Sequence, residues 1–480
     1  MGQKKQNAAG TVETLLSGWT GVEIEEHRVE QHPRRLSRFD HPAQLGDRHY
    51  QPYFQTDFSE SMEELITAPH QAVQAVSSQL HSLQQLLTEQ LHPDEVIWPL
   101  SMPPKLQPSD VTFLEKTFKR DWYQGYRDLL LAKYGPLQHI MCGVHVSYSP
   151  TPAIVSWYQA QHQIADRVTA KNQLMFQITQ ELVGFRWLLT YLFGASPLDE
   201  NQPAPRPLVR SLRASHRGFG NRSDVHVSYQ RLADFVNQQL EAIRTKKLFA
   251  PSEFYGPVRL KAKNGLASIP QQGIDYLELR TLDNDPFATD GVAPTTLRVV
   301  RLLILAGILF PEPWDAERLA TAAAANDQVA LAAPTAPLPA DLQASAKQLV
   351  ERLQTVVKQL PNPADWQASL AMVRDRLQDP DQTTAGRLVP YVHQDSLSDF
   401  GFQRGLATKR ARQGAALSAQ FPDVVPELVP VYRYLAQTGI PFRVQDPTKL
   451  VVTIADQTPI TVTNPAQLAE LQALWQAHFQ

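Results

Sequence analysis

Alternating apolar and polar residues predict three strands in this chain of 480 residues. The runs are WTGVEIEEHRVE (19–30), HIMCGVHVSYS (139–149) and GIDYLELRTL (273–282). Successive side chains of an extended chain point to opposite faces, so Glu23 and Glu25 share one face while Val22 and Ile24 share the other. Two carboxylates at that spacing repel one another. The pair is therefore either a surface feature or a site where a cation compensates the charge.

Apolar residues recurring every three to four positions predict helices between and after these strands. The helical stretches are 72–91, two long patterns from about 152 to 193 and from 227 to 246, the apolar run VVRLLILAGILF (299–310) and Leu342 to Leu360. The segment ATAAAANDQVALAAPTAPLPAD (320–341) has no clear periodicity and reads as a loop or linker. The tail from Lys449 reads as two short strands and a closing helix. Strands separated by long helices predict an α+β fold.

Two further sets of polar residues stand out against the apolar pattern. In TDFSESMEELIT (56–67), Asp57, Glu60 and Glu64 fall at i, i+3 and i+7, on one face if a helix begins at Asp57. A capped helix N-terminus explains that spacing and is the preferred interpretation of the segment alone. On the strand at 273–282, Glu278 and Arg280 share a face. They either pair with each other or act as a metal ligand beside a phosphate ligand.

His145 is the candidate imidazole of the strand CGVHVSYS, where it shares a face with Ser147. A lone strand histidine is usually a packing residue, and Cys142 lies on the opposite face, so a cysteine–histidine nucleophile is set aside. The spacings of zinc sites are absent. Carboxylates with one imidazole favour magnesium or manganese, which usually serve phosphate chemistry. The chain has neither a G-x-x-x-x-G-K-[ST] loop nor a G-x-G-x-x-G turn, so P-loop NTPases, kinases and Rossmann dehydrogenases lack support.

Composition and charge indicate the compartment and the kinds of partner to expect for this protein. Lys plus Arg number 45 and Asp plus Glu 48, and the basic clusters are short and scattered, which indicates solvated faces more than a nucleic-acid surface. Cys142 is the only cysteine, as suits a reducing compartment. The chain shows no signal peptide and no apolar run near the roughly 18 residues of a membrane span. We expect a soluble, cytoplasmic protein without a nucleic-acid or membrane partner, and its oligomeric state cannot be read.

Several motifs resemble those of the bacterial glutamate-cysteine ligases, also called γ-glutamylcysteine synthetases, in order and approximate spacing. They are GVEIEEHRV, TDFSESMEELIT, VIWPLSMPP, CGVHVSYS, LTYLFGASP, SLRASHRGFGN, SEFYGPVRLK and GIDYLELRTLDNDPF. The resemblance covers about residues 19 to 315. It implies a fold similar to glutamine synthetase, in which an antiparallel sheet surrounded by helices forms a funnel lined by carboxylates that hold magnesium ions.

The resemblance also implies roles for individual residues. Arg280 would contact the phosphates of ATP or the transferring phosphoryl group, and Arg213 would face substrate. Tyr126 and Tyr255 would border the acceptor pocket. The residues implied at or beside metal-binding positions are Glu23, Glu25, Asp57, Glu60, Glu64, His145 and Glu278.

The implied reaction is the first step of glutathione biosynthesis. An ATP- and Mg²⁺-dependent enzyme, with Mn²⁺ as a possible substitute, would join the γ-carboxylate of L-glutamate to the amine of L-cysteine through a γ-glutamyl phosphate. Where many relatives read HYNFS, this chain has Val146 and Ser147, and Phe219 replaces a tyrosine near the acceptor pocket. Losing such a polar contact weakens acceptor discrimination, so a γ-glutamyl ligase for another amine is the close alternative.

Two alternatives of other classes remain open. One is a non-catalytic nucleotide- or metal-binding homologue that keeps the funnel. The other is a carboxylate-pair hydrolase of glycosidic bonds, which the accompanying histidine and arginine disfavour.

Pattern and resemblance together divide the chain into five segments. They are an N-terminal, weakly anchored helical segment (1–18), a ligase-like catalytic region (19–315), an Ala/Pro-rich loop or linker (316–340), a helical region packed on the core (341–425) and a small C-terminal α/β unit (426–480). No second ATP-binding module of the kind fused in bifunctional glutathione synthases is recognisable. We therefore expect only the first step here.

Overall fold

The structure is a computed structural model that describes residues 12–203, 206–454 and 458–478. These residues form two compact units, which are described one at a time. Unit 1 is built from the described parts of residues 1–20, 100–102 and 143–397. Unit 2 is built from those of residues 21–99, 103–142 and 398–480.

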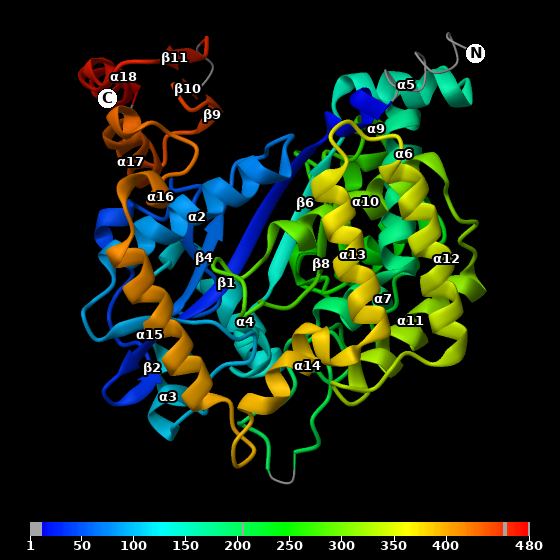
Figure 1. The fold of residues 1–480 in the computed structure, drawn as a ribbon, viewed down its shortest axis with the longest axis horizontal. Coiled ribbons are helices and arrows are strands. Elements are labelled where there is room, and N and C mark those ends of the chain that lie inside the picture. The colour runs from blue at the N-terminus through cyan, green and yellow to red at the C-terminus, as the bar shows by residue number, and fades with distance from the viewer. Residues whose placement is uncertain (1–11, 204–205, 455–457, 479–480) are drawn as a thin grey trace. The chain divides into compact units, whose positions relative to one another are not determined.

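The strands of unit 2 are organised around β1, which pairs antiparallel with β4, β2 and β5 (Figure 1). Strand β3 continues the ladder beyond β4. The register places Glu25 opposite Glu64 and His27 opposite Met62. A separate small sheet, in the order β11-β10-β9, lies near the C-terminus. The bounds are β1 (Trp19–Gln31), β2 (Arg34–Leu36), β3 (Phe54–Thr56), β4 (Met62–Ile66), β5 (Glu95–Trp98), β9 (Phe442–Asp446), β10 (Lys449–Val452) and β11 (Ile460–Val462).

Helices of unit 2 pack against this ladder from different parts of the chain. Helix α2 contacts β4, and α15 contacts both β5 and α2. The ring of Trp98 on β5 meets Phe402 on α15 at 5.3 Å between centroids, so an N-terminal strand and a C-terminal helix share one apolar core. The bounds are α2 (Val73–Gln90), α3 (Pro108–Lys116), α4 (Gln124–Tyr134), α15 (Ser398–Gly414), α16 (Leu417–Gln420), α17 (Val429–Thr438) and α18 (Leu468–His478).

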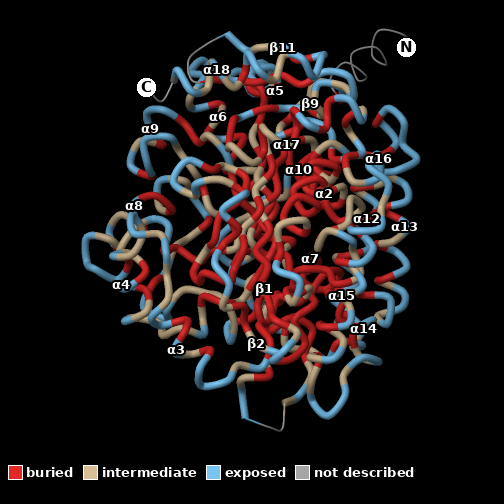
Figure 2. Tube along the Cα trace, turned by 90° about the vertical axis from the view of Figure 1, so that its left-hand side faces the viewer, coloured by how far each residue is buried: buried red, intermediate tan, exposed pale blue. Residues whose placement is uncertain are grey.

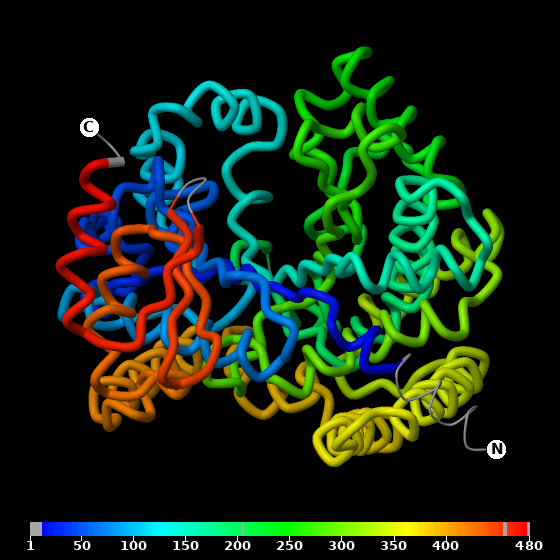
Figure 3. The backbone as a smooth tube through the Cα atoms, turned by 90° about the horizontal axis from the view of Figure 1, so that it is seen from above, coloured from blue at the N-terminus to red at the C-terminus, as the bar shows by residue number. Residues whose placement is uncertain are grey.

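Unit 1 holds an antiparallel ladder in the order β6-β8-β7, with helices α6 and α7 packed on its strands. Helices α12 and α13, yellow in Figure 3, lie side by side and pack on α10. The strands are β6 (Val144–Ser149), β7 (Val258–Lys261) and β8 (Tyr276–Leu282). The helices are α5 (Pro152–His162), α6 (Arg167–Gly184), α7 (Arg186–Phe193), α8 (Leu232–Arg244), α9 (Ile269–Gln272), α10 (Pro294–Leu309), α11 (Ala316–Leu331), α12 (Ala340–Val357), α13 (Ala364–Gln378) and α14 (Thr384–Leu388).

Burial follows the predicted pattern in most elements. Helix α10 is buried on nearly every side, which explains its unbroken apolar run. Of its two arginines, Arg301 is buried and donates to the carbonyl oxygens of Leu16 and Gly18 at 2.8 Å. Strand β1 is buried along most of its length, as the red tube at its label in Figure 2 shows, although more than half of its residues are polar. A strand that buries charges must supply partners for them.

The predicted α+β class, with antiparallel strands covered by helices, is confirmed, as are the helices at 72–91, 299–310 and from Leu342. The tail has the expected strands and closing helix. The loop or linker expected at 316–340 is wrong for most of its length, because α11 occupies Ala316–Leu331. Alanine has the highest helix propensity, and Asp315 caps the helix by accepting from the backbone N–H of Arg318.

The N-terminal segment is better anchored than expected where the structure describes it. Residues 12–16 are helical and bury Val12 and Leu15, while residues 1–11 lie outside the described residues. The two units do not follow the five predicted segments, whose functional division stays a prediction. Among the described helices, none has both the length and the apolar character needed to cross a bilayer.

Candidate active site

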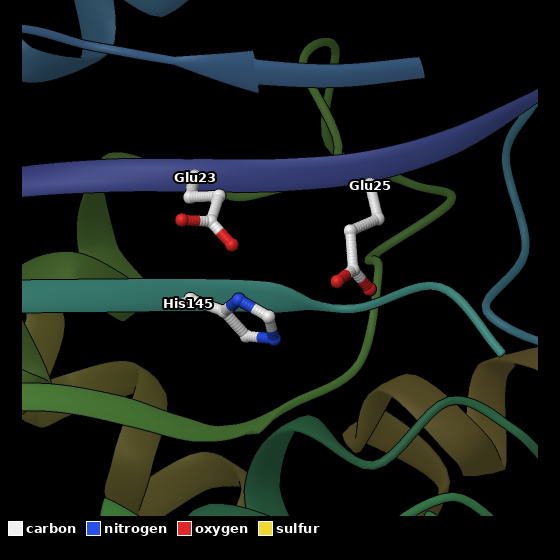
Figure 4. Close-up of side chains that lie close together, drawn as sticks. All are labelled: Glu23, Glu25 and His145. Atoms are coloured by element: carbon white, nitrogen blue, oxygen red, sulfur yellow. The ribbon is translucent and has the colours of Figure 1, made fainter. Parts of the chain in front are cut away.

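Four carboxylates of unit 2 gather beside the ladder of β1 and β4, and we call Glu23, Glu25, Asp57 and Glu64 the acidic cluster. Glu23 and Glu25 leave the same side of β1, as Figure 4 shows, with carboxylate oxygens within 4.8 Å of each other. Glu64 stands directly opposite Glu25 across the ladder. Asp57 follows the end of β3. Strand alternation and register thus bring together acids that are separated by more than thirty residues in the sequence.

The acidic cluster makes ionisation of Glu64 costly. Burial and the neighbouring charges of Glu23 and Asp57, followed by a hydrogen bond to Glu23 and the charge of Glu25, raise the pKa of Glu64 well above its usual range. Like charges in a partly buried place are tolerated when a proton or a cation offsets them. The arrangement is therefore suited to binding cations.

The helix expected from Asp57 onward is wrong, because the segment forms the hairpin of β3 and β4. The turn is closed by the backbone N–H of Met62, which donates to the carbonyl of Ser59 at 3.0 Å. Pairing with β1 satisfies the backbone of β4 and buries Met62 and Leu65. That gain outweighs a capped helix N-terminus of a few residues.

Glu60 is turned away from the predicted metal-binding role. Its carboxylate accepts hydrogen bonds from Arg48 Nη1 at 3.0 Å and from the backbone N–H of His41 at 3.2 Å. The side chain is almost fully buried. A carboxylate held by an arginine in this way is already compensated, so the prediction of Glu60 as a metal ligand is not supported by its contacts.

Aromatic side chains border the acidic cluster within unit 2. Burial and the charge of Asp57, followed by Tyr126, raise the pKa of Tyr123 above its usual range, and Arg120 opposes them. The rings of Tyr123 and Tyr126 meet edge to face at 5.2 Å between centroids. Tyr126, the predicted acceptor-pocket residue, therefore belongs to a tyrosine pair near the acids.

A second charged group, which we call the Glu278 cluster, lies on β7 and β8 of unit 1. Its carboxylate forms an ion pair with Arg280, and lies 3.5 Å from Arg259 Nη1 and 3.3 Å from Lys261 Nζ. Arg259 is the direct cross-strand neighbour of Glu278. Burial by itself raises the pKa of Glu278, but Arg259, Arg280, Lys261 and His145 together hold it well below its usual range. Glu278 is thus a fixed anion that orders several cations.

His145 lies among arginines of the same unit. The ring, drawn in Figure 4, places Nε2 3.4 Å from Arg213 Nη2 and Nδ1 3.5 Å from Arg280 Nη1. Arg213 also donates from Nη1 to the carbonyls of Arg280 and Leu282, both at 3.1 Å. A β-carbon on Gly143 would lie 2.0 Å from Arg213 Nη2, so only glycine leaves room for this guanidinium.

A cavity of about 250 Å³ opens beside these residues, entirely within unit 1. Phe219 and Tyr255 form one wall, with ring centroids 4.5 Å apart. The other lining residues that matter below are Arg186, Arg213, Arg280, Asn326 and Asp327. A cavity lined by both arginines and aromatic rings suits a small anionic molecule with an apolar part.

The sequence pattern of the family described as glutamate-cysteine ligase matches residues 4–248 and 223–329, well over half of the chain. The chain belongs to the glutamate-cysteine ligase family. The resemblance drawn from the motifs is thereby confirmed.

Relatives of this glutamate-cysteine ligase family member include fused proteins. The glutathione biosynthesis bifunctional protein of Streptococcus agalactiae is 34% identical over 397 residues, 82% of this chain and 52% of that protein. The corresponding protein of Streptococcus thermophilus is 33% identical over 398 residues, again 82% and 52%. The chain thus spans about half the length of these curated relatives.

Solved structures share the fold. The crystal structure of a bifunctional glutathione synthetase from Pasteurella multocida has a TM-score of 0.86 at 26% identity, and the match covers 95% of this chain and 61% of that one. The glutamate–cysteine ligase of Francisella tularensis in complex with AMP has a TM-score of 0.76 at 22% identity, with coverage of 88% and 92%.

In this family member, the structure brings four of the predicted residues together and adds others that were not predicted. Arg213, Phe219, Tyr255 and Arg280 do meet around one cavity. Arg259 and Lys261 were not predicted, although side-chain alternation in VRLK places both on one face of β7. The strand register sets Arg259 directly opposite Glu278. Arg186, Asn326 and Asp327 were also missed, and for them the sequence held no signal, because packing of α11 on α7 brings them together.

The acidic cluster predicts a pH dependence of stability in the metal-free protein. Because the pKa of Glu64 is raised in the folded state, its contribution is fully present below the unfolded pKa and is lost as pH rises through the folded pKa. Glu64→Gln cannot ionise, so we expect it to raise the Tm at pH 8 by about 2–4 °C and to leave the Tm at about pH 4, below the unfolded pKa, nearly unchanged. Thermal unfolding in the presence of a chelator measures this.

The matched control is Glu115→Gln, which removes an exposed carboxylate from α3 of the same unit. It should follow the wild-type pH profile. Added Mg²⁺ should raise the Tm of wild type more than that of Glu64→Gln, because the cation offsets the repulsion that the variant lacks. Parallel profiles for wild type and Glu64→Gln would contradict this electrostatic account.

Proposed function

We propose that the chain is an ATP- and Mg²⁺-dependent ligase that joins the γ-carboxylate of L-glutamate to the amine of L-cysteine, the first step of glutathione biosynthesis. Membership of the glutamate-cysteine ligase family supports this. The observation that carries most weight is the acidic cluster, whose crowding raises the pKa of Glu64. Such a cluster has little use in a protein that binds no cation.

The donor set of the acidic cluster fits a hard divalent cation. Glu23, Glu25, Asp57 and Glu64 offer only carboxylate oxygens, which suit Mg²⁺ and Mn²⁺. When bound, such an ion would offset the charge of ATP phosphates. His145 and Glu278 stay predicted as ligands. Glu278 already pairs with cations, so it fits less well than the acidic cluster.

The residues of the Glu278 cluster have a proposed role toward phosphate. Arg280, with Arg259 and Lys261, supplies fixed positive charge for the phosphoryl group in transfer. The γ-carboxylate oxygen of glutamate attacks the γ-phosphorus of ATP, and the bond to the bridging oxygen breaks to release ADP. Ordered cations favour this step because they need no rearrangement as charge shifts.

The second step joins the acceptor. The amine nitrogen attacks the carbonyl carbon of the γ-glutamyl phosphate, the carbon–oxygen bond to phosphate breaks, and the amine gives up a proton. Phe219 and Tyr255 offer the acceptor an aromatic wall with one hydroxyl. Phe219 adds no hydrogen bond, so an amine other than cysteine is the alternative substrate. A cytoplasmic location remains a prediction from the sequence.

The experiment is an ADP-release assay with purified protein, ATP and Mg²⁺. We expect release to need both glutamate and an amine acceptor, and cysteine to exceed other amino acids by at least about 10-fold in kcat/KM. The γ-glutamyl product is identified by mass spectrometry. Release of ADP that does not change when the amino acids are omitted would sink the ligase proposal, and a different best acceptor would replace only the cysteine assignment.

A further inference from the structure

Arg186 is a charged residue of the cavity that neither the motifs nor the proposed reaction uses. It stands at the start of α7 and lines the cavity with Arg213 and Arg280. Its Nε is buried and has no hydrogen-bond partner among the residues that the structure describes. The neighbouring Arg213 donates from Nη1 to two backbone carbonyls. A buried guanidinium atom without a partner is costly unless a ligand supplies one.

Two polar residues that line the cavity with Arg186 form hydrogen bonds to other groups. Asp327 accepts from the backbone N–H of His216 at 2.8 Å and lies 2.7 Å from its Nδ1. Asn326 donates to the carbonyl of Ala214 at 2.9 Å and accepts from Thr190 Oγ1 at 2.8 Å. These bonds hold α11 and the loop after Arg213 in place. Arg186 lines this cavity together with two further arginines and two aromatic rings.

The size and the lining of the cavity determine which anionic molecule fits it. Its volume of about 250 Å³ is small for a nucleotide and sufficient for an amino acid. Arginine presents parallel N–H donors that match a carboxylate. Phe219 and Tyr255, which also line the cavity, suit the short side chain of the same molecule. Amino-acid carboxylates therefore fit the charge, size and apolar surface of this cavity together.

We propose that Arg186 is a specificity-determining residue that binds the α-carboxylate of the acceptor amino acid. The inference rests on the proposed ligase function. It specifies that an acceptor carries a free carboxylate beside its amine. Asp327 acts through its neighbours as a positioning residue, because its bonds to His216 shape the cavity wall. An amine that lacks the carboxylate should enter the cavity but bind weakly.

The test compares two acceptors that differ only in the carboxylate, L-cysteine and cysteamine, with wild type and Arg186→Gln. For wild type we expect kcat/KM to be about 100-fold higher with L-cysteine, as for other buried charge pairs. In Arg186→Gln the value for L-cysteine should fall by about 100-fold, whereas that for cysteamine should stay within about threefold. Arg186→Lys keeps the charge but not the paired donors, and should restore part of the loss.

The matched control is Arg244→Gln, an exposed arginine on α8 that pairs with Glu241 and should behave as wild type. Equal losses with both acceptors in Arg186→Gln would overturn the proposal, since they would indicate a structural role. A raised KM for glutamate, with the KM for L-cysteine unchanged, would overturn it too, because the carboxylate bound would then belong to the donor.

A binding measurement keeps this proposal separate from the proposed reaction. If no variant and no wild-type preparation releases ADP in a glutamate-dependent manner, the ligase proposal fails. Calorimetric titration with L-cysteine and cysteamine then still reports on Arg186. A carboxylate-dependent affinity that Arg186→Gln lowers by about 100-fold supports the assignment. The same Kd for L-cysteine in wild type and variant overturns it.

Discussion

Replacing Glu278 by glutamine is expected to lower the rate of ADP release by about 100- to 1000-fold. Glutamine keeps the shape of the side chain but removes the charge that Arg280 and Lys261 share. Without that anion the cations repel one another and lose their fixed positions. Preorganised charge is usually the largest contribution to transition-state stabilisation, so the loss should appear in kcat more than in KM.

The comparison for Glu278→Gln is Glu241→Gln, in which an exposed carboxylate paired with Arg244 on α8 is removed instead. It should keep the wild-type rate. Circular dichroism and Tm separate a loss of rate from a loss of fold. A folded Glu278→Gln protein that turns over within about threefold of wild type, with only its metal affinity altered, would favour a non-catalytic binding protein over an enzyme.

Replacing Arg28 by methionine is expected to lower the free energy of unfolding by about 3–5 kcal/mol. Arg28 lies on β1 in the interior of unit 2 and is completely buried. Its Nε donates to Glu63 and its Nη1 to Glu95, both at 2.6 Å, and Nη2 reaches the carbonyl of Glu60 at 2.7 Å. Methionine fills similar space but leaves the buried carboxylate of Glu95 without its arginine and that of Glu63 with His41 alone.

Urea denaturation followed by tryptophan fluorescence measures the effect of Arg28→Met. Arg231→Met removes an exposed arginine that pairs with Asp234 at 2.6 Å, and should leave the midpoint of unfolding unchanged. Because Arg28 lies outside the acidic cluster, the folded variant should retain activity at low temperature. A midpoint equal to that of wild type would show that the carboxylates find other partners, against the role assigned to Arg28.

Several features of the candidate site could be predicted from the local sequence pattern. The alternation of residues 19–30 put Glu23 and Glu25 on one face of a strand, and β1 has that geometry. The same logic paired Glu278 with Arg280 on β8. Helices α2, α10 and α12 followed from their apolar spacing. Period and propensity are properties of neighbouring residues, so a sequence displays them directly.

Other features depended on partners far away along the chain. The sequence spacing of Glu60 predicts that it joins the acidic cluster. In the structure, the β3–β4 hairpin directs its carboxylate to Arg48 instead. The spacing of the acids in residues 57–66 is that of a helix face. In the structure, however, the segment contains β4, which pairs with β1. Helix α11 looked like a linker, yet its packing on α7 brings Asp327 to the cavity of Arg186.

By itself, then, the sequence determined the family, the α+β class, most helices and strands, and which faces carry acids. Tertiary structure alone decided which acids meet, which are neutralised by arginine, and which cations surround Glu278. The physical reason is that side-chain direction is set by local backbone geometry, whereas charge compensation depends on distances between segments that only folding brings together.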